Sequence, residues 1–234
     1  MRILFVGNSH SYFNDMPATF ARLCAAAGAG EVVPTLLAYS GRPLGWHLDE
    51  YFSLRYNLLY GRYDYCVLQQ QAHPFPGRAV LLADGGRIAA LCRAGGATPV
   101  VLTTWAERRA PEHQAEMTGA ARALAAQEGA LLAPVGEIWQ RLREDHPELE
   151  LFWKDGEHAS PYGSYLEAVT LCGVLTGCDV TALPATGGDF SRGADIAFYD
   201  HPRVLEDPAA VAEELDPDRC ALIRAAVAER LREG

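Results

Sequence analysis

Three side chains that could carry out nucleophilic catalysis lie far apart in the sequence. Ser9 belongs to the polar stretch GNSHS at residues 7–11, which follows an apolar run at residues 2–7. Asp155 precedes His158 by three residues, shortly before Ser160. A serine hydroxyl needs a base to remove its proton, and an imidazole base needs a carboxylate to fix its tautomer. These residue types therefore predict a serine nucleophile with a histidine base and an aspartate partner.

Each motif also has a purely structural explanation. Gly, Asn and Ser are common turn formers, so the stretch after residue 7 could be only a loop. The pair formed by Asp155 and His158 could be a polar start of a helix. Ser11 fits a capping role and is the alternative nucleophile. The presence of both motifs in this order favours the catalytic interpretation.

The elements that must position these residues alternate along the chain. Short apolar runs occupy residues 2–7, 31–40, 63–70, 98–106 and 130–135, and helical stretches follow at 17–28, 85–96, 111–129 and 136–147. This alternation is typical of a parallel sheet of about five strands that is covered on both faces. We therefore predict an α/β fold, a three-layer α/β/α sandwich whose polar strand ends converge at one edge.

The remaining third of the chain completes a single predicted domain over residues 1–234. Ser160 as N-cap and Pro161 at the first helical position indicate a helix over 160–176. Residues 178–206 gather Gly, Asp and Pro without periodicity, and we expect an irregular excursion there. Asp216 and Pro217 open a C-terminal helix at about 216–232, with Cys220, Ile223 and Val227 on its inner side.

Composition narrows the possible partners. The 20 basic against 30 acidic residues give a formal charge of −10, which disfavours nucleic acid as a partner. The sequence contains no apolar stretch of about 18 residues that could span a membrane and no signal-peptide pattern, so we expect a cytoplasmic protein.

The six cysteines are scattered and predict buried free thiols. The histidines lack metal-binding spacing, so no metal site is predicted.

The blocks FVGNSHS and DGEH resemble the first and last signature blocks of the SGNH (GDSL-type) hydrolases, over residues 1 to about 176. The resemblance implies a flavodoxin-like fold and a nucleophile at Ser9, with His158 as base and Asp155 as its orienting acid. It also implies oxyanion donors at the N–H groups of Ser9 and Gly41, and no cofactor. The expected reaction is hydrolysis of an acetyl or short acyl ester through an acyl-enzyme, with a small-molecule or carbohydrate ester as substrate. An acyltransferase with the same site, or a noncatalytic module that binds a sugar or phosphate, is the alternative.

The third block of the family departs from its usual pattern here. An asparagine amide normally completes the oxyanion hole, but the third strand runs into LQQQAHPF without an asparagine. We favour Gln71 as the replacement because a neutral amide donates at every pH. Gln69, Gln70 and His73 are the alternatives. Three aromatic residues near strand ends are candidates for substrate binding, namely Trp105, Trp46 and Tyr12.

Overall fold

A parallel sheet of five strands forms the centre of the molecule in a computed structural model that describes residues 1–188 and 212–233. Its strands are β1 (Arg2–Gly7), β2 (Val33–Ala38), β3 (Tyr65–Gln69), β4 (Thr98–Leu102) and β5 (Leu131–Ala133). The spatial order is β2-β1-β3-β4-β5. This order places the point where the chain reverses direction across the sheet between β1 and β3, and ligands bind at such points.

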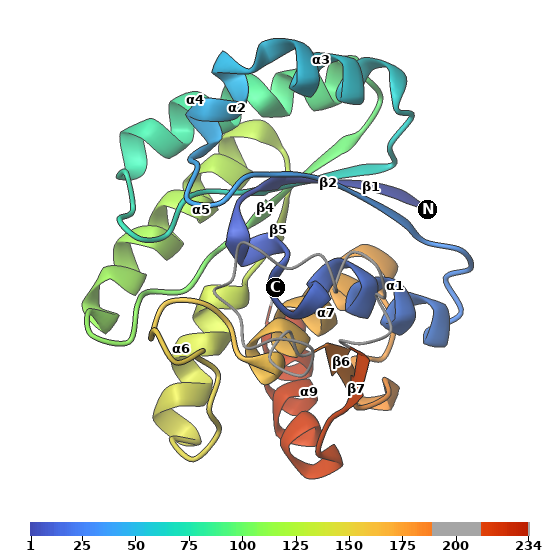
Figure 1. Ribbon diagram of the computed structural model, residues 1–234, viewed down its shortest axis with the longest axis vertical. Helices are drawn as coiled ribbons and strands as arrows, with labels where there is room; N and C mark the ends of the chain where they lie inside the picture. Colours follow the sequence, from blue (N-terminus) through green and yellow to red (C-terminus); the bar gives the residue numbers. More distant parts are fainter. Residues whose placement is uncertain (189–211, 234) are drawn as a thin grey trace.

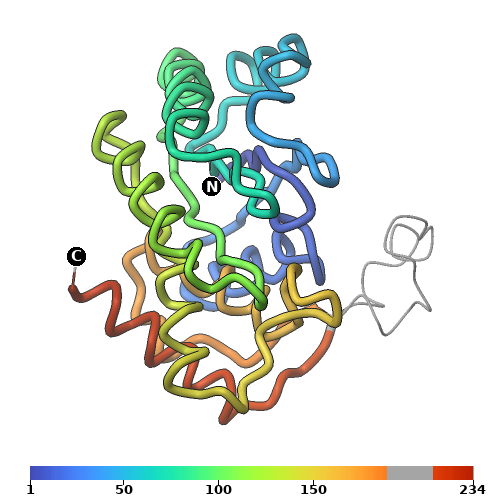
Figure 2. Tube along the Cα trace, turned by 90° about the vertical axis from the view of Figure 1, so that its left-hand side faces the viewer, coloured from blue at the N-terminus to red at the C-terminus, as the bar shows by residue number. Residues whose placement is uncertain are grey.

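Helices cover both faces of the sheet, which lies between them in Figure 1. One layer contains α2 (Leu44–Asp49), α3 (Tyr51–Tyr60), α4 (Arg78–Ala94) and α5 (Gln114–Glu128). The opposite layer contains α1 (Met16–Ala26), α6 (Val135–Asp145), α7 (Pro161–Thr176) and α9 (Pro217–Arg232). In the side view of Figure 2, α9 lies at the end of the molecule opposite to α3 and α4.

Alternating strand residues separate the core into two halves. Ile3 and Phe5 of β1 pack in the cluster that includes α1, α7 and α9, whereas Leu4 and Val6 pack in the cluster that includes α3 and α4. All four side chains are at most 1% exposed. Burial on both faces explains why the strands appear in the sequence as continuous apolar runs. The predicted three-layer α/β/α fold is therefore confirmed.

Several predicted elements agree closely with the structure. The helix expected over 160–176 is α7, and the Ser160 hydroxyl accepts a hydrogen bond from Gly163 N–H as an N-cap. The C-terminal helix expected at 216–232 is α9, where Cys220, Ile223 and Val227 are buried. All six cysteines are free thiols, and five of them are buried.

One predicted boundary was wrong, and one segment predicted to be irregular is regular in part. The helix expected over 85–96 begins at Arg78, because Gly85 and Gly86 lie inside α4 instead of opening it. A Cβ at Gly85 would collide with Leu124 of α5, so the glycine serves close packing of two helices. The predicted irregular excursion at 178–206 contains a short helix (Val180–Ala182) and β6 (Thr186–Gly188), which pairs with β7 (Ala212–Glu214). Residues 189–206 of that prediction lie outside the described residues.

Across residues 1–188 and 212–233, no helix is both long enough and apolar enough to cross a bilayer.

Candidate active site

The turn after β1 holds Ser9 in a short 3-10 helix, Ser9–Ser11. Asn8 caps this helix, since its Oδ1 accepts a hydrogen bond from His10 N–H at 3.1 Å. Its Nδ2 donates to the carbonyl of Arg42 at 3.1 Å, which ties the turn to the segment after β2. Because every residue from Asn8 to Ser11 is buried, these hydrogen bonds fix the turn without competition from water.

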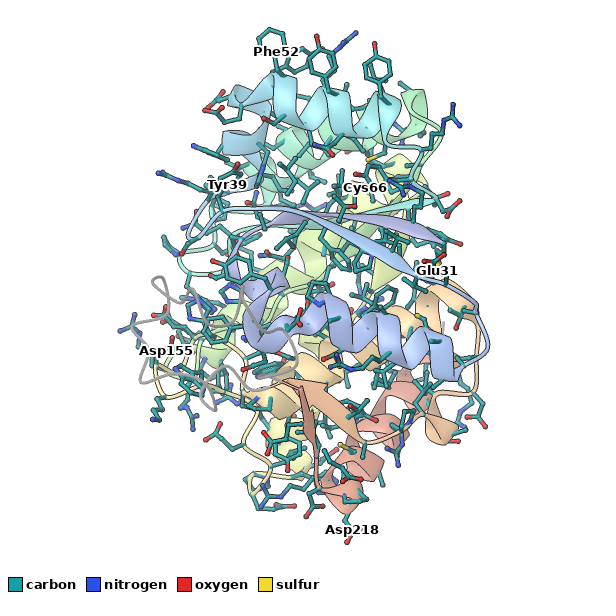
Figure 3. All side chains as sticks on the ribbon, turned by 45° about the vertical axis from the view of Figure 1, so that its right-hand side comes forward. Glu31, Tyr39, Phe52, Cys66, Asp155 and Asp218 are labelled. Atoms are coloured by element: carbon teal, nitrogen blue, oxygen red, sulfur yellow. The ribbon has the colours of Figure 1, made fainter. Side chains whose placement is uncertain are left out.

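Ser9, His158 and Asp155 form a continuous chain of hydrogen bonds. Ser9 Oγ lies 2.8 Å from His158 Nε2, and His158 Nδ1 lies 2.7 Å from Asp155 Oδ2. The carboxylate can accept only from Nδ1–H, which leaves the Nε2 lone pair free to accept the serine proton. The fold thus joins groups that lie 149 residues apart in the sequence. Figure 3 shows Asp155 on the side of Tyr39, the end toward which β2 runs.

The loop around Asp155 holds its carboxylate in the ionised form. Burial tends to raise the pKa of Asp155, but the backbone N–H groups of Glu157 and His158 and the His158 ring together lower it below its ordinary value. Both N–H groups donate to Asp155 Oδ1, at 2.9 and 3.0 Å. One oxygen therefore anchors the loop while the other orients the imidazole.

A second set of hydrogen bonds holds the Ser9 turn against the segment that follows His158. Asn14 Nδ2 donates to the carbonyl of Ala159 at 3.0 Å and to Ser164 Oγ at 2.9 Å. Ser164 Oγ in turn donates to the carbonyl of Phe13 at 3.1 Å. Asn14 adopts φ 53°, a left-handed conformation that Asn tolerates better than most residues. These contacts connect the Ser9 turn directly to α7, which follows His158.

Aromatic rings surround the His158 imidazole. Phe13 stacks on it with ring centroids 4.3 Å apart, and the ring of His10 lies 5.0 Å away. His10 also stacks with His73 at 5.1 Å. Burial, followed by the charges of His158 and His73, lowers the pKa of His10 well below its ordinary value. His10 is therefore neutral near pH 7, and it adds no positive charge beside His158.

A cavity of about 170 Å³ opens over Ser9 and His158. Its lining includes Gly41, which lies in a β-turn closed by the hydrogen bond from Arg42 N–H to the carbonyl of Tyr39. Gly41 occupies the third position of this turn with φ 66°, a conformation that favours glycine. Within the described residues, no hydrogen bond engages the N–H of Ser9 or that of Gly41. The other lining residues are Asn8, His10, Ser40, Gln71, Ala72, His73 and Glu157.

The three glutamines at the end of β3, Gln69–Gln71, have different surroundings. Gln69 Oε1 accepts hydrogen bonds from Asn8 N–H at 2.8 Å and from Ser11 Oγ at 3.0 Å, so this amide holds the Ser9 turn. Gln70 Oε1 accepts from Leu44 N–H at 2.9 Å and from Gln71 N–H at 2.8 Å. Gln71 lines the cavity, and its Nε2 donates to the carbonyl of His73 at 3.3 Å. Of the three amides, only that of Gln71 belongs to a cavity-lining residue.

Several other candidate residues lie away from the cavity lining. Trp105 is fully buried, stacks on Trp139 at 4.1 Å, and donates from Nε1 to the carbonyl of Glu157 at 2.8 Å. It therefore supports the loop that carries His158 from within the core. Trp46 lies in α2 against Tyr39, and Tyr12 is half-buried at the end of the Ser9 helix.

The supporting roles of Gln69 and Asn14 were missed in the sequence. Gly7 offers a signal in retrospect, because a Cβ at this position would collide with Gln69 Oε1. A glycine at the end of a buried strand is a sign that another group approaches closely. Asn14 offers no comparable signal, since its partners lie about 150 residues away.

Comparison with solved structures identifies the fold. No protein-family model and no curated protein matches the sequence. A protein from Slackia heliotrinireducens, described as "a putative SGNH hydrolase", is 29% identical with a TM-score of 0.64, and the match covers 75% of this chain and 98% of that one. A DUF4886 family protein from Bacteroides uniformis is 16% identical with a TM-score of 0.66, and covers 99% of this chain and 95% of its own.

An acetyl xylan esterase is a further structural neighbour. It is 12% identical with a TM-score of 0.60, and the match covers 75% of this chain and all (100%) of that one. The fold of this chain is therefore shared with proteins of very different sequence. Together with the strand order and the 29% identity to the Slackia protein, it shows that the chain has the fold of the SGNH (GDSL-type) hydrolases.

Proposed function

We propose that this hydrolase cleaves acetyl or other short acyl esters through an acyl-enzyme on Ser9. The observation that carries the proposal is the hydrogen-bonded chain from Ser9 through His158 to Asp155, with the serine facing a cavity. The cavity volume of about 170 Å³ favours a short acyl group over a long chain. Small-molecule and carbohydrate esters are the proposed substrate class, in keeping with the acetyl xylan esterase among the neighbours.

In the first half of the proposed reaction, Ser9 Oγ attacks the carbonyl carbon as its proton passes to His158 Nε2. The carbonyl oxygen becomes an oxyanion, for which the N–H groups of Ser9 and Gly41 and the Gln71 amide are the proposed donors. The bond between the carbonyl carbon and the alcohol oxygen then breaks. His158 Nε2–H gives its proton to the departing alcohol, which leaves an acyl group on Ser9.

In the second half, water replaces the alcohol. His158 Nε2 accepts a proton from this water as the water oxygen attacks the acyl carbon. The bond to Ser9 Oγ breaks, the proton returns to Ser9, and the carboxylic acid departs. Asp155 stays ionised throughout and stabilises the imidazolium, a role that its lowered pKa supports.

A fluorophosphonate probe tests the nucleophile. We expect the unchanged protein to be labelled and the Ser9→Ala variant to remain unlabelled. Ser11→Ala is the matched control, because Ser11 is a buried serine of the same turn whose hydroxyl bonds to Gln69. Labelling that persists in Ser9→Ala, or disappears in Ser11→Ala alone, would remove Ser9 from its proposed role.

A further inference from the structure

A second cavity adjoins the one at Ser9. It has a volume of about 160 Å³ and shares two wall residues, Ala72 and His73, with the Ser9 cavity. Its walls come from the connection between β3 and α4, from the connection between β4 and α5, and from the first turn of α5, near the carboxyl edge of the sheet (Figure 1). The unshared lining residues are Pro74, Phe75, Ala106, Glu107, His113, Glu116 and Met117.

His73, which lines both cavities, lies near the proposed base. The His10 ring is 5.0 Å from His158 and 5.1 Å from His73, so the shared wall is close to the proposed base. The charges of Glu157 and His158 also act on the pKa of His73, which burial lowers below its ordinary value. A general base that returns its proton to the leaving oxygen must lie beside the alcohol half of the ester. The alcohol half is therefore the part that the second cavity can receive.

The lining of this cavity is apolar at its base and negatively charged at its rim. Ala72, Ala106 and Met117 form a small buried cluster, and Phe75 packs against it. Arg109 is shared between Glu107 at 2.7 Å and Glu157 at 3.7 Å, whereas no ion pair within the described part of the chain engages Glu116. The rim therefore carries more negative than positive charge, which opposes an anionic ligand.

We infer, building on the proposed function, that the second cavity is a subsite for the alcohol half of the ester. It accepts a compact alcohol with an apolar body that is uncharged or positively charged, and it rejects an alcohol that carries a carboxylate. The apolar base contacts the body of the alcohol. Glu116 and Glu107 act on the charge of that alcohol.

Four acetyl esters with a common acyl group test this subsite. Methyl acetate is the reference with a minimal alcohol, and 3,3-dimethylbutyl acetate and acetylcholine form a pair of equal shape that differs in charge. The acetyl ester of 4-hydroxybutanoate supplies an anionic alcohol of similar length. We expect kcat/KM to be highest for acetylcholine, about two- to fivefold lower for its neutral counterpart, as for exposed charge pairs, and lowest for the anionic ester.

Two variants separate shape from charge. Glu116→Gln should reduce the ratio of kcat/KM between acetylcholine and its neutral counterpart toward one, while Glu112→Gln, an exposed carboxylate of the same segment outside both cavities, should preserve it. Ala106→Leu, which fills the base of the cavity, should lower kcat/KM for 3,3-dimethylbutyl acetate relative to methyl acetate.

The outcomes distinguish this subsite from the proposed chemistry. A charge ratio that is the same in Glu116→Gln and in the unchanged protein, with all esters hydrolysed, overturns the subsite and leaves the esterase intact. The absence of hydrolysis for all four esters, together with absence of fluorophosphonate labelling, overturns the esterase itself. Because Glu116 is exposed on α5, its variant should fold even if Ala106→Leu does not.

Discussion

At the scale of single residues, the site depends on groups that each have one task. His158 contacts both the nucleophile and Asp155, so it is the group through which every proton of the proposed reaction passes. Gln71 is the amide beside the cavity, whereas Gln69 and Gln70 use their oxygens to hold backbone N–H groups. Neighbouring residues of one type therefore differ in function because their partners differ.

Replacing the proposed base should slow the reaction strongly. We expect His158→Ala to lower kcat for 4-nitrophenyl acetate by at least about 100-fold, the usual scale for loss of a general base. His146→Ala is a suitable control, because His146 is paired with Glu148 on the surface and lines neither of the two cavities. Turnover in His158→Ala equal to that of the control would contradict the assignment.

Replacing Gln71 tests the third oxyanion donor. Gln71→Ala should lower kcat by about 100-fold to 1000-fold with little change in KM, since such a donor acts mainly on the transition state. Gln127→Ala, at an exposed glutamine of α5, is the matched control. If kcat stays unchanged, Gln71 is not an oxyanion donor, and the same measurement on Gln70→Ala and His73→Ala would identify the replacement.

At the scale of elements, the turn after β1 and the start of α7 behave as one unit. The contacts of Asn14 with Ala159 and Ser164 set the separation between the segments that carry Ser9 and His158. A misplacement of about 1 Å between reacting groups can cost about 100-fold in rate. The alignment of the two segments is therefore as important as the identity of the reacting residues.

A glycine substitution at position 14 tests the alignment of these two segments without changing a reacting residue. Asn14→Gly keeps the left-handed conformation available and removes both side-chain hydrogen bonds. We expect kcat and the rate of fluorophosphonate labelling to fall in parallel by about 10- to 100-fold, with KM nearly unchanged. Arg62→Gly is the control, because Arg62 also has φ 53° but lies on the exposed segment before β3. A purely structural role for Asn14 would lower stability and leave the labelling rate of the folded protein unchanged.

The sequence predicted the existence of the helices and strands better than the contacts that fix their ends and hold the site. Five apolar runs were sufficient for the sheet, because both faces of a parallel sheet are buried and each strand is therefore apolar throughout. The start of α4 was wrong because Gly85, a residue that usually weakens helices, is required for packing against Leu124. The antiparallel pair of β6 and β7 has strands of three residues, which are too short to show alternation.

For the site, the sequence predicted the residues that lie in short motifs and missed the residues that support them. Ser9, Asp155 and His158 stood out because their chemistry is specific and because each lies in a short motif, Ser9 in GNSHS and the other two in DGEH. The roles of Asn14 and Gln69 depend on contacts with residues 58 to 150 positions away, which the sequence alone does not display. Trp105 was one of three aromatic candidates for substrate binding, but its ring lies in the core, since burial of such a large apolar surface is itself strongly favourable.

At the scale of the whole molecule, one buried carboxyl links stability to pH. Glu167 lies in α7 with no exposed surface, and within the described residues neither of its carboxyl oxygens has a hydrogen-bond partner. Burial raises its pKa well above the ordinary value of 4.5. The folded protein therefore keeps Glu167 protonated at pH values where the unfolded chain has lost this proton.

The difference between the pKa of Glu167 in the folded and in the unfolded state sets the direction in which stability changes with pH. Well below pH 4.5 both states hold the proton, and Glu167 does not make stability depend on pH. As the pH rises toward the folded-state pKa, the free energy of unfolding should fall by about 1.4 kcal/mol for each pH unit. Glu167→Gln, which has the shape of the protonated form, should remove this decline in urea unfolding curves measured from pH 4 to pH 8. Glu144→Gln, at an exposed position in α6, should retain it.

The distance along the chain between Ser9 and His158 has a consequence for protein synthesis. A nascent chain that has left the ribosome only as far as β5 already contains the whole central sheet, together with the serine, yet it lacks the imidazole. The proposed ester cleavage can begin only after α7 has emerged and docked on the turn that follows β1. Termination between β5 and that helix would release a fragment with the whole central sheet and without the proposed esterase activity, so the onset of the proposed turnover would mark the docking of α7.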